Sequence, residues 1–187
     1  ETVAELIRIT GEPDYPLRLV PLLRFMGATA ADTVTRAAHL TTCSTENVRL
    51  GRIKAIADGS IQGFSARLRW PGYYRVPDHA VWNMPPEKLA ETVDVLNARG
   101  LQVHIHTNGD LATEVALNAV EQALDRCPRP DHRHTLQHCQ LPDRAQFRRM
   151  AKLGLCVNLF ANHVFYFGDK HYELTLGPDR AQRLANC

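Results

Sequence analysis

The sequence predicts an α/β protein of the (β/α) TIM-barrel type, and three observations lead to this prediction. Short apolar segments alternate about five times with segments of helical periodicity, a pattern typical of βαβ units and a parallel sheet. Polar side chains follow several of the apolar segments, and functional residues of barrel enzymes occupy such strand ends. Neither GxGxxG nor GxxxxGK[ST] occurs, which disfavours the remaining architecture, an open doubly wound sheet with a nucleotide site.

The first half of the chain is expected to contain two strands, two helices and a long loop. Pro21 weakens the first strand because proline cannot donate a ladder hydrogen bond. The loop has no clear hydrophobic period, and loops of such length inside a compact domain are often functional. The expected elements are helices at 1–10 and 30–40, strands at 17–25 and 52–57, and the loop at 59–84.

The second half alternates more regularly. Leu89, Val93 and Leu96 share one helical face, and Gly100 supplies a stop signal after that helix. Asp110 is a good N-cap for the next helix. The expected elements are helices at 86–99 and 110–126, from Pro142 onward and at 179–185, with strands at 101–107, 134–138 and 155–160.

Composition and charge exclude several classes of protein. The 187 residues are 44% apolar and 22% charged, as in a single globular domain. A formal net charge of +2 gives no reason to expect a nucleic acid or a membrane surface as partner. No apolar segment approaches the roughly 18 residues of a membrane span, and the first residues do not resemble a signal peptide. The five cysteines are widely spaced and form no CxxC motif, so we expect a reducing, cytoplasmic location.

Histidines are concentrated in the second half of the chain, and histidine is the commonest metal ligand. His104 and His106 lie two residues apart in an expected strand, so they share a face and can present two nitrogens to one ion. His138 would add a third imidazole, because neighbouring strand ends lie only about 4.8 Å apart. It would share a face with His132 and His134 if its strand were regular. An HxH pair alone is a weak signal, since a single histidine is often a buried core residue.

Lys54 stands within the apolar segment 53–57. A lysine on a buried strand face is costly to desolvate unless it is paired or chemically modified. Alternatively, its stem could follow the apolar surface while the ammonium stays in water. Composition alone does not choose between these interpretations.

Four segments in this order resemble the amidohydrolase superfamily, and more narrowly amidohydrolase family 3, whose members are metal-dependent hydrolases on a TIM-barrel scaffold. The segments are IKAIADGSIQG at 53–63, HTNGD at 106–110, QHCQ at 137–140 and NHVFYFGDKH at 162–171. The final LGPDRA at 176–181 also fits this branch. The resemblance extends from about residue 14 to the end of the chain, and the ordered motifs make it specific at the family level.

The resemblance implies a ligand set for a divalent metal, with one or two ions and zinc as the usual one. Lys54 matches a lysine on strand four that can be carbamylated by CO2 and bridge two metals, which would turn a buried cation into an anionic oxygen ligand. His106 matches the ligand histidine of strand five, and His138 matches that of strand six. Residues at pocket positions of the family, expected to bind a small-molecule substrate, are Asn108, Gln140 and His163.

The resemblance also implies that the barrel is incomplete. The family carries an HxH motif on strand one and a catalytic Asp on strand eight, and neither is in this chain. We therefore expect about strands three to seven of eight, as one partial barrel domain over residues 1–187. The parent enzyme would hydrolyse amide or cyclic amide C–N bonds with metal-activated water. No catalytic residue is assigned here, because the general-base Asp is expected elsewhere, so the 187 residues alone are expected to be inactive.

Two expectations concern partners and alternatives. An arc of parallel strands leaves two unpaired edges, so we expect a homo-oligomer that covers them. The main alternative to a hydrolase is a non-catalytic metal-binding or structural α/β domain. The identity of the substrate lies in loops that one sequence does not interpret.

Overall fold

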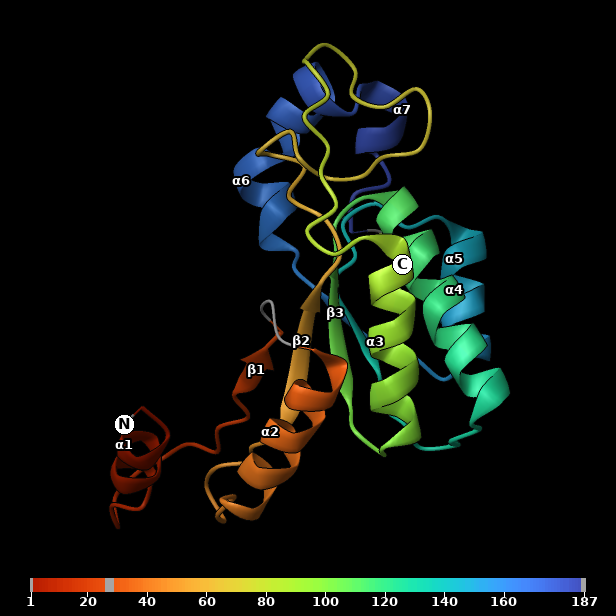
Figure 1. Cartoon of the computed structure of the whole chain (residues 1–187). Helices are drawn as coiled ribbons and strands as arrows, with labels where there is room; N and C mark the ends of the chain where they lie inside the picture. The colour runs from red at the N-terminus through yellow and green to blue at the C-terminus, as the bar shows by residue number, and fades with distance from the viewer. Residues whose placement is uncertain (1, 26–28, 186–187) are drawn as a thin grey trace.

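Five parallel strands form one sheet in the computed structural model of the chain, which describes residues 2–25 and 29–185 (Figure 1). Their order in the sheet, β1-β2-β3-β4-β5, follows their order in the sequence. A doubly wound sheet needs a point where this order reverses, and the described sheet has none. The expected barrel-type, incomplete α/β fold is therefore confirmed. The strands are Leu22–Arg24 (β1), Arg52–Ile56 (β2), Val103–Thr107 (β3), Thr135–His138 (β4) and Cys156–Leu159 (β5).

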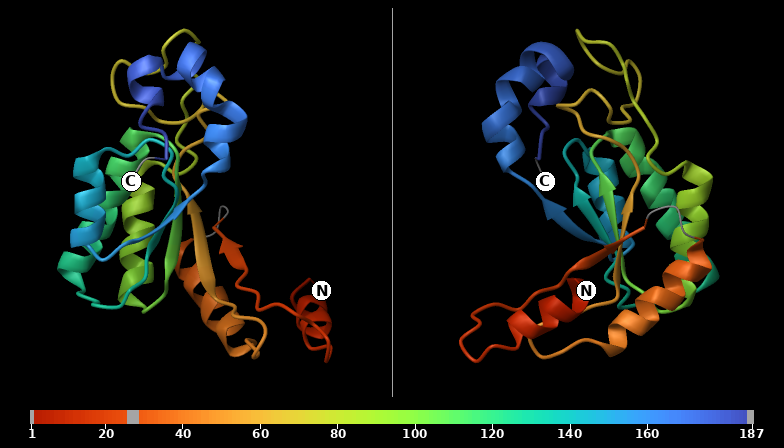
Figure 2. Two further views of the ribbon diagram at one scale, coloured as in Figure 1. Left: turned by 180° about the vertical axis from the view of Figure 1, so that it is seen from behind. Right: turned by 60° about the vertical axis from the view of Figure 1, so that its left-hand side comes forward.

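The helices between the strands cover one face of the sheet (Figures 1 and 2). Crossovers between parallel strands are right-handed. A strand order without reversal therefore places all the crossover helices on the same side of the sheet. Side chains alternate accordingly: Ile53 and Ala55 are fully buried, whereas Lys54 between them is half-buried. The predicted helix stripe of Leu89, Val93 and Leu96 lies in the same core. The helices are Ala30–Thr42 (α2), Pro86–Ala98 (α3), Asp110–Arg126 (α4) and Arg144–Lys152 (α5).

A second layer, which we call the cap (residues 59–84 and 162–185), lies over the carboxyl ends of the strands (Figure 1). Its C-terminal part comprises α6 (Asn162–Lys170), the π-helix η1 (His171–Thr175) and α7 (Pro178–Ala181). The backbone N–H groups of Tyr74 and Arg75 donate to the carbonyls of Thr175 and Leu174, at 2.9 and 2.8 Å. The cap also contributes most of a separate apolar cluster, which includes Ile61, Leu68, Tyr73, Leu141, Leu176 and Leu184. Its two segments therefore support each other.

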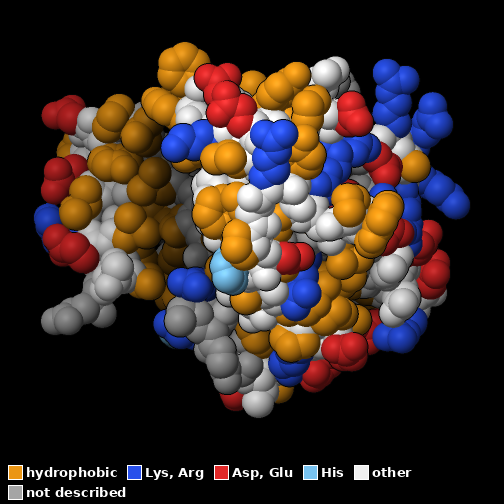
Figure 3. All heavy atoms as spheres, turned by 90° about the horizontal axis from the view of Figure 1, so that it is seen from above, with side chains coloured by type: hydrophobic (Ala, Val, Ile, Leu, Met, Phe, Trp, Pro, Cys, Tyr) orange, Lys and Arg blue, Asp and Glu red, His pale blue; other side chains and the backbone are white. Residues whose placement is uncertain are grey.

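The outer surface of the cap is rich in hydrophobic side chains (Figure 3). Trp70 is 94% exposed, Phe165 83% and Tyr166 67%. Tyr73 is buried instead, and Trp82 lies under the Arg67 guanidinium at 5.1 Å. Some aromatic residues of the long loop are thus packed against the chain, whereas others are exposed.

Several predicted elements were wrong in extent. The strand expected at 17–25 shrinks to β1, and before Pro21 only Leu19 forms an isolated bridge, to Val48. The helix expected from Pro142 begins at Arg144, because the Asp143 carboxylate caps it by accepting the Gln146 N–H at 2.8 Å.

The C-terminal region differs most from the sequence prediction. The helix expected at 179–185 is the four-residue α7. Helices α6 and η1 were not predicted, because an aromatic segment containing Gly168 has weak intrinsic helix propensity. Their packing against the rest of the chain decides their structure.

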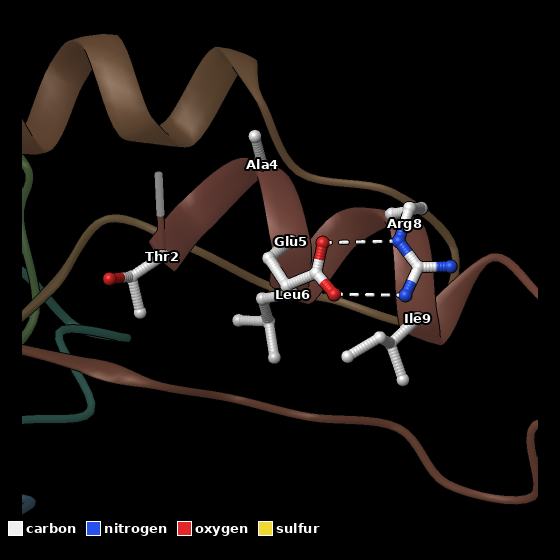
Figure 4. Close-up of a pocket in the computed structure, with 6 residues that line it drawn as sticks. All are labelled: Thr2, Ala4, Glu5, Leu6, Arg8 and Ile9. Atoms are coloured by element: carbon white, nitrogen blue, oxygen red, sulfur yellow. Dashed lines mark hydrogen bonds and ion pairs between the residues drawn. The ribbon is translucent and has the colours of Figure 1, made fainter.

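Helix α1 (Thr2–Thr10) lies apart from the sheet (Figures 1 and 2). A hollow of about 810 Å³ runs along it, and Glu5 and Arg8 form an ion pair beside it at 2.9 Å (Figure 4). All residues that line this hollow belong to α1, so it contains none of the predicted site residues.

Two further features concern membrane-spanning helices and the cysteines. Within the described residues, no helix combines the length and the hydrophobicity that crossing a membrane would require. Cys43, Cys127, Cys139 and Cys156 are free thiols, while Cys187 lies outside the described residues.

Candidate active site

His104 and His106 project from the open face of the sheet, as strand alternation predicted, and Lys54 lies on the same face. In the β2–β3 register Lys54 pairs with His104, and Ile56 pairs with His106. Residues in register on parallel strands point to the same side, and residues two apart on one strand do so as well. Lys54, His104 and His106 therefore share the face that α2–α5 leave uncovered.

His138 also lies beside His106, but strand alternation does not place it there. Its register partner is Thr107, which is fully buried toward the helices, so a regular strand would direct His138 there too. Positive φ angles of 73° at His138 and 40° at Cys139 end the strand abruptly. The His138 ring consequently lies edge-on against the His106 ring, with centroids 4.6 Å apart. His138 was expected to share a face with His134 only if the strand were regular. The strand is not regular at His138.

The Lys54 amine is half-buried and meets a neutral partner. Its Nζ donates to the Gln137 Oε1, and no carboxylate of a described residue lies within 4.0 Å. Gln137 Nε2 in turn lies 3.4 Å from His104 Nδ1. Burial lowers the pKa of Lys54 to about 8. Sequence reasoning missed Gln137, although its register with His106 places it on the open face by alternation.

His106 is held through its Nε2 atom. This nitrogen lies 2.9 Å from the Gly59 carbonyl and 2.9 Å from the Asn108 amide nitrogen. The imidazole can donate Nε2–H to the carbonyl, which leaves the Nδ1 lone pair for a cation. Metal-binding histidines commonly donate their second ring nitrogen to a carbonyl in this way. Burial lowers the pKa of His106 and holds the ring neutral, the form that binds metals.

His138 is also a neutral imidazole. Burial lowers its pKa to about 4, and the adjacent His106 and Lys54 act in the same direction. Two neutral rings therefore lie side by side at the ends of β3 and β4, and the Lys54 amine projects from the neighbouring strand β2 on the same face as His106.

Asp58 anchors the long loop to the end of β3 next to His106, whose Nε2 lies 3.8 Å from the Asp58 Oδ1. Its carboxylate is fully buried and accepts N–H groups from Arg67, Asn108 and Gly109 at 3.0, 3.0 and 2.9 Å. Burial raises the pKa of Asp58 to about 6, while these donors oppose the rise. Because the three donors come from the long loop and the end of β3, Asp58 ties the loop to the site. In the sequence, Asp58 was indicated by its position directly after an apolar strand.

The expected N-cap role of Asp110 was wrong. Gly109 is the N-cap residue of α4, and the Asp110 carboxylate accepts the Arg69 N–H at 2.8 Å. The long loop passes so close that a Cβ on Gly109 would lie 1.9 Å from the Arg67 carbonyl oxygen. Gly109 and Asp110 therefore dock the loop onto α4.

The three residues expected to bind substrate are buried, and each has a polar atom without a partner among the described residues. These atoms are Asn108 Oδ1, His163 Nδ1 and both amide atoms of Gln140. The His163 ring lies 6.0 Å from the His138 ring and 4.7 Å from the Phe160 ring, between centroids. Asn108 is anchored by its amide nitrogen to the Gly59 carbonyl at 2.7 Å. Buried polar atoms usually have partners, so this concentration of exceptions is typical of a ligand site.

The donor set fits a divalent metal only in part. In residues 2–25 and 29–185, no three His, Cys, Asp or Glu side chains are arranged to hold an ion. His106 and His138 supply two imidazoles, and Lys54 would supply an oxygen only after carbamylation. The site can thus contribute part of a coordination shell.

Comparisons with known proteins identify the family and the fold. The model of the amidohydrolase family matches residues 1–187. The protein YtcJ of Bacillus subtilis (strain 168), which is named as an amidohydrolase, is 30% identical over 128 residues, covering 68% of this chain and 24% of YtcJ. LONG AFTER FAR-RED 3 of Arabidopsis thaliana is 29% identical over 133 residues, covering 71% and 22%. The chain thus spans about a quarter of the length of these relatives.

Two solved structures share the fold. An uncharacterized metal-dependent hydrolase from Pyrococcus furiosus superposes with a TM-score of 0.73 at 18% identity, covering 98% of this chain and 37% of that one. A second one, from Pyrococcus horikoshii OT3, gives 0.72 at 18% identity, covering 97% and 35%.

Proposed function

This chain belongs to the amidohydrolase family, and we propose from that premise that it is part of a metal-dependent hydrolase that breaks amide or cyclic amide C–N bonds. The observation that carries the proposal is the close approach of His106 and His138, with ring centroids 4.6 Å apart, on the face from which the half-buried Lys54 also projects. The cap over these residues would shield a small-molecule substrate from water.

We assign the metal-ligand roles to Lys54, His106 and His138, with zinc as the expected metal. A bound divalent ion would lower the pKa of a water molecule toward 7 and polarise the scissile carbonyl. His106 would bind through Nδ1 in the tautomer that donates its Nε2–H to the Gly59 carbonyl. The deprotonated form of the Lys54 amine, made more accessible by its lowered pKa of about 8, would add CO2 and lose a proton, which gives a carbamate with two oxygen donors.

Substrate contacts are proposed for Asn108, Gln140 and His163. Asn108 Oδ1 can accept a hydrogen bond from an amide N–H, and His163 lies on the cap side of His138. Gln140 offers both a donor and an acceptor, and neither has a partner among the described residues. These groups suit a polar, uncharged amide.

Zinc binding tests the assignment. In isothermal titration of the metal-free chain with zinc chloride, His106→Ala and His138→Ala should each weaken binding at least about tenfold, since even second-layer changes cost that much. His79→Ala, in an exposed loop position, is the matched control and should bind zinc like the original chain. Unchanged binding in both site variants would contradict the assignment.

Hydrolysis tests the reaction separately. We expect the 187 residues alone to hydrolyse neither an amide nor a cyclic amide, because the proposed general base lies outside them. A longer polypeptide that carries this chain should show a zinc-dependent rate that His106→Ala abolishes. Zinc binding without hydrolysis in that polypeptide would favour the non-catalytic alternative.

Self-association is proposed from the two sheet edges. Strands β1 and β5 each pair with one described strand only, and unpaired edges favour association with another copy. Sedimentation velocity should show a dimer or larger assembly at micromolar concentration. A monomer at all concentrations would contradict this proposal.

A further inference from the structure

A cleft of about 290 Å³ lies at the amino end of the sheet, opposite the candidate active site. The chain enters β2 and β3 here, and the loop before β4 forms one wall. Gly51 lets the start of β2 approach the end of α2, because its φ is 91° and a Cβ would lie 2.0 Å from Thr41 Oγ1. This approach brings the Arg49 and Arg52 side chains to one side of the cleft.

Four arginines line this cleft, together with one carboxylate. They are Arg49, Arg52, Arg129 and Arg133. Asp131 is already paired with Arg133, with its Oδ1 2.8 Å from the Arg133 Nε. The chain as a whole has a formal net charge of only +2, so the cleft is a local concentration of positive charge.

Three of these arginines have no charged partner among the described residues. Arg129 donates to the carbonyls of Gly100 and Leu101, at 2.9 and 3.2 Å. Arg52 Nε donates to Gln102 Oε1 at 2.9 Å, which leaves its two terminal nitrogens available. No carboxylate of a described residue lies within 4.0 Å of Arg49, Arg52 or Arg129. Neutral acceptors orient a guanidinium without neutralising its charge.

We propose that this cleft binds a small phosphate-bearing anion, such as a phosphate monoester. Guanidinium groups present paired N–H donors that match phosphate oxygens, and their charge-assisted hydrogen bonds are the strong ones. The volume lies at the lower end of small-molecule sites, which suits a phosphate with a small organic group. The cleft lies at the opposite strand ends from His106 and His138, and phosphate binding there does not depend on the proposed hydrolase activity.

Titration with inorganic phosphate and with glycerol phosphate tests the proposal. The metal-free 187-residue chain is used in EDTA, with chloride holding the ionic strength constant because surface charge interactions are screened by salt. We expect saturable binding that Arg52→Gln weakens at least about tenfold, the loss expected for one charge-assisted hydrogen bond. Arg49→Glu, at an exposed position where folding is not at risk, should weaken it at least as much.

Arg148→Gln is the matched control, because Arg148 is an exposed arginine of α5 outside the cleft. It should bind both probes like the original chain. Equal loss in Arg148→Gln, or no loss in Arg49→Glu, would overturn the site. Binding of polyglutamate or single-stranded DNA much more tightly than of either phosphate would overturn the assignment to a small anion.

Discussion

The two ends of the sheet use the same side chain, histidine, in opposite ways. At the amino end, every ring nitrogen of His132 and His134 has a partner. His134 accepts the Val103 N–H at 3.2 Å and donates to Asn97 Oδ1 at 3.1 Å. His132 accepts the His134 N–H at 2.9 Å and donates to the Leu153 carbonyl at 2.8 Å.

On the open face and beneath the cap, the pattern is reversed. His163 Nδ1 and His104 Nε2 are buried without a partner among the described residues. His106 and His138 lie with their rings in contact. The hydrogen-bonded rings at the amino end are typical of structural residues, whereas the unpaired His163 nitrogen beneath the cap supports the proposed ligand site. Histidine content alone does not separate these two roles.

Removing one histidine from each end gives the largest expected contrast. His134→Ala should lower the free energy of unfolding by roughly 3 kcal/mol, because it leaves the buried Val103 N–H without an acceptor. His138→Ala should change it by less than about 1 kcal/mol, because the ring packs beside another imidazole at an open site. Urea denaturation of both variants measures the contrast, and equal losses would remove the distinction between the two ends.

Acid should destabilise the amino end. Burial lowers the pKa of His134 to about 3, below the ordinary value of 6.5. The unfolded chain therefore binds a proton at His134 between about pH 6.5 and 3, and the folded chain does not. This contribution to stability is complete above pH 6.5 and falls by up to about 1.4 kcal/mol per pH unit below it.

Unfolding free energies at pH 7.5, 6.5 and 5.5 measure this slope. His104, His138 and His171, each with a pKa lowered to about 4 by burial, add to it with the same sign. His134→Asn should reduce the slope by an amount that corresponds to about one proton taken up on unfolding. An unchanged slope in that variant would show that His134 titrates normally.

Replacing Lys54 should give the smallest effect, and in the opposite direction. Lys54→Met keeps the apolar stem and removes a half-buried amine, so the free energy of unfolding should rise by about 1 kcal/mol. Zinc binding should weaken in the same variant. Lys152→Met, at an exposed position, is the control and should change neither quantity. A destabilised Lys54→Met would mean that the contact with Gln137 holds the sheet together.

The sequence was sufficient wherever a local rule decides the structure. Alternation along a strand placed His104 and His106 on one face, and helical periodicity identified the core stripe of α3. The motif order also indicated an incomplete barrel, which the sheet order confirms.

Long-range contacts explain what the sequence did not reveal. The left-handed backbone at His138 turns its ring toward His106 against the strand alternation. Asn97 and His134 are distant in sequence, so their hydrogen bond has no local signal. The cap depends on contacts between the long loop and η1, and η1 has no periodic pattern of its own.

Zinc anomalous diffraction from crystals of the chain tests the central claim most directly, because it locates the ion without assuming its ligands. We predict one main peak about 2.0–2.1 Å from a ring nitrogen of both His106 and His138, with the Lys54 side chain beside it. Peaks only at other histidines, or none near these two rings, would contradict the account.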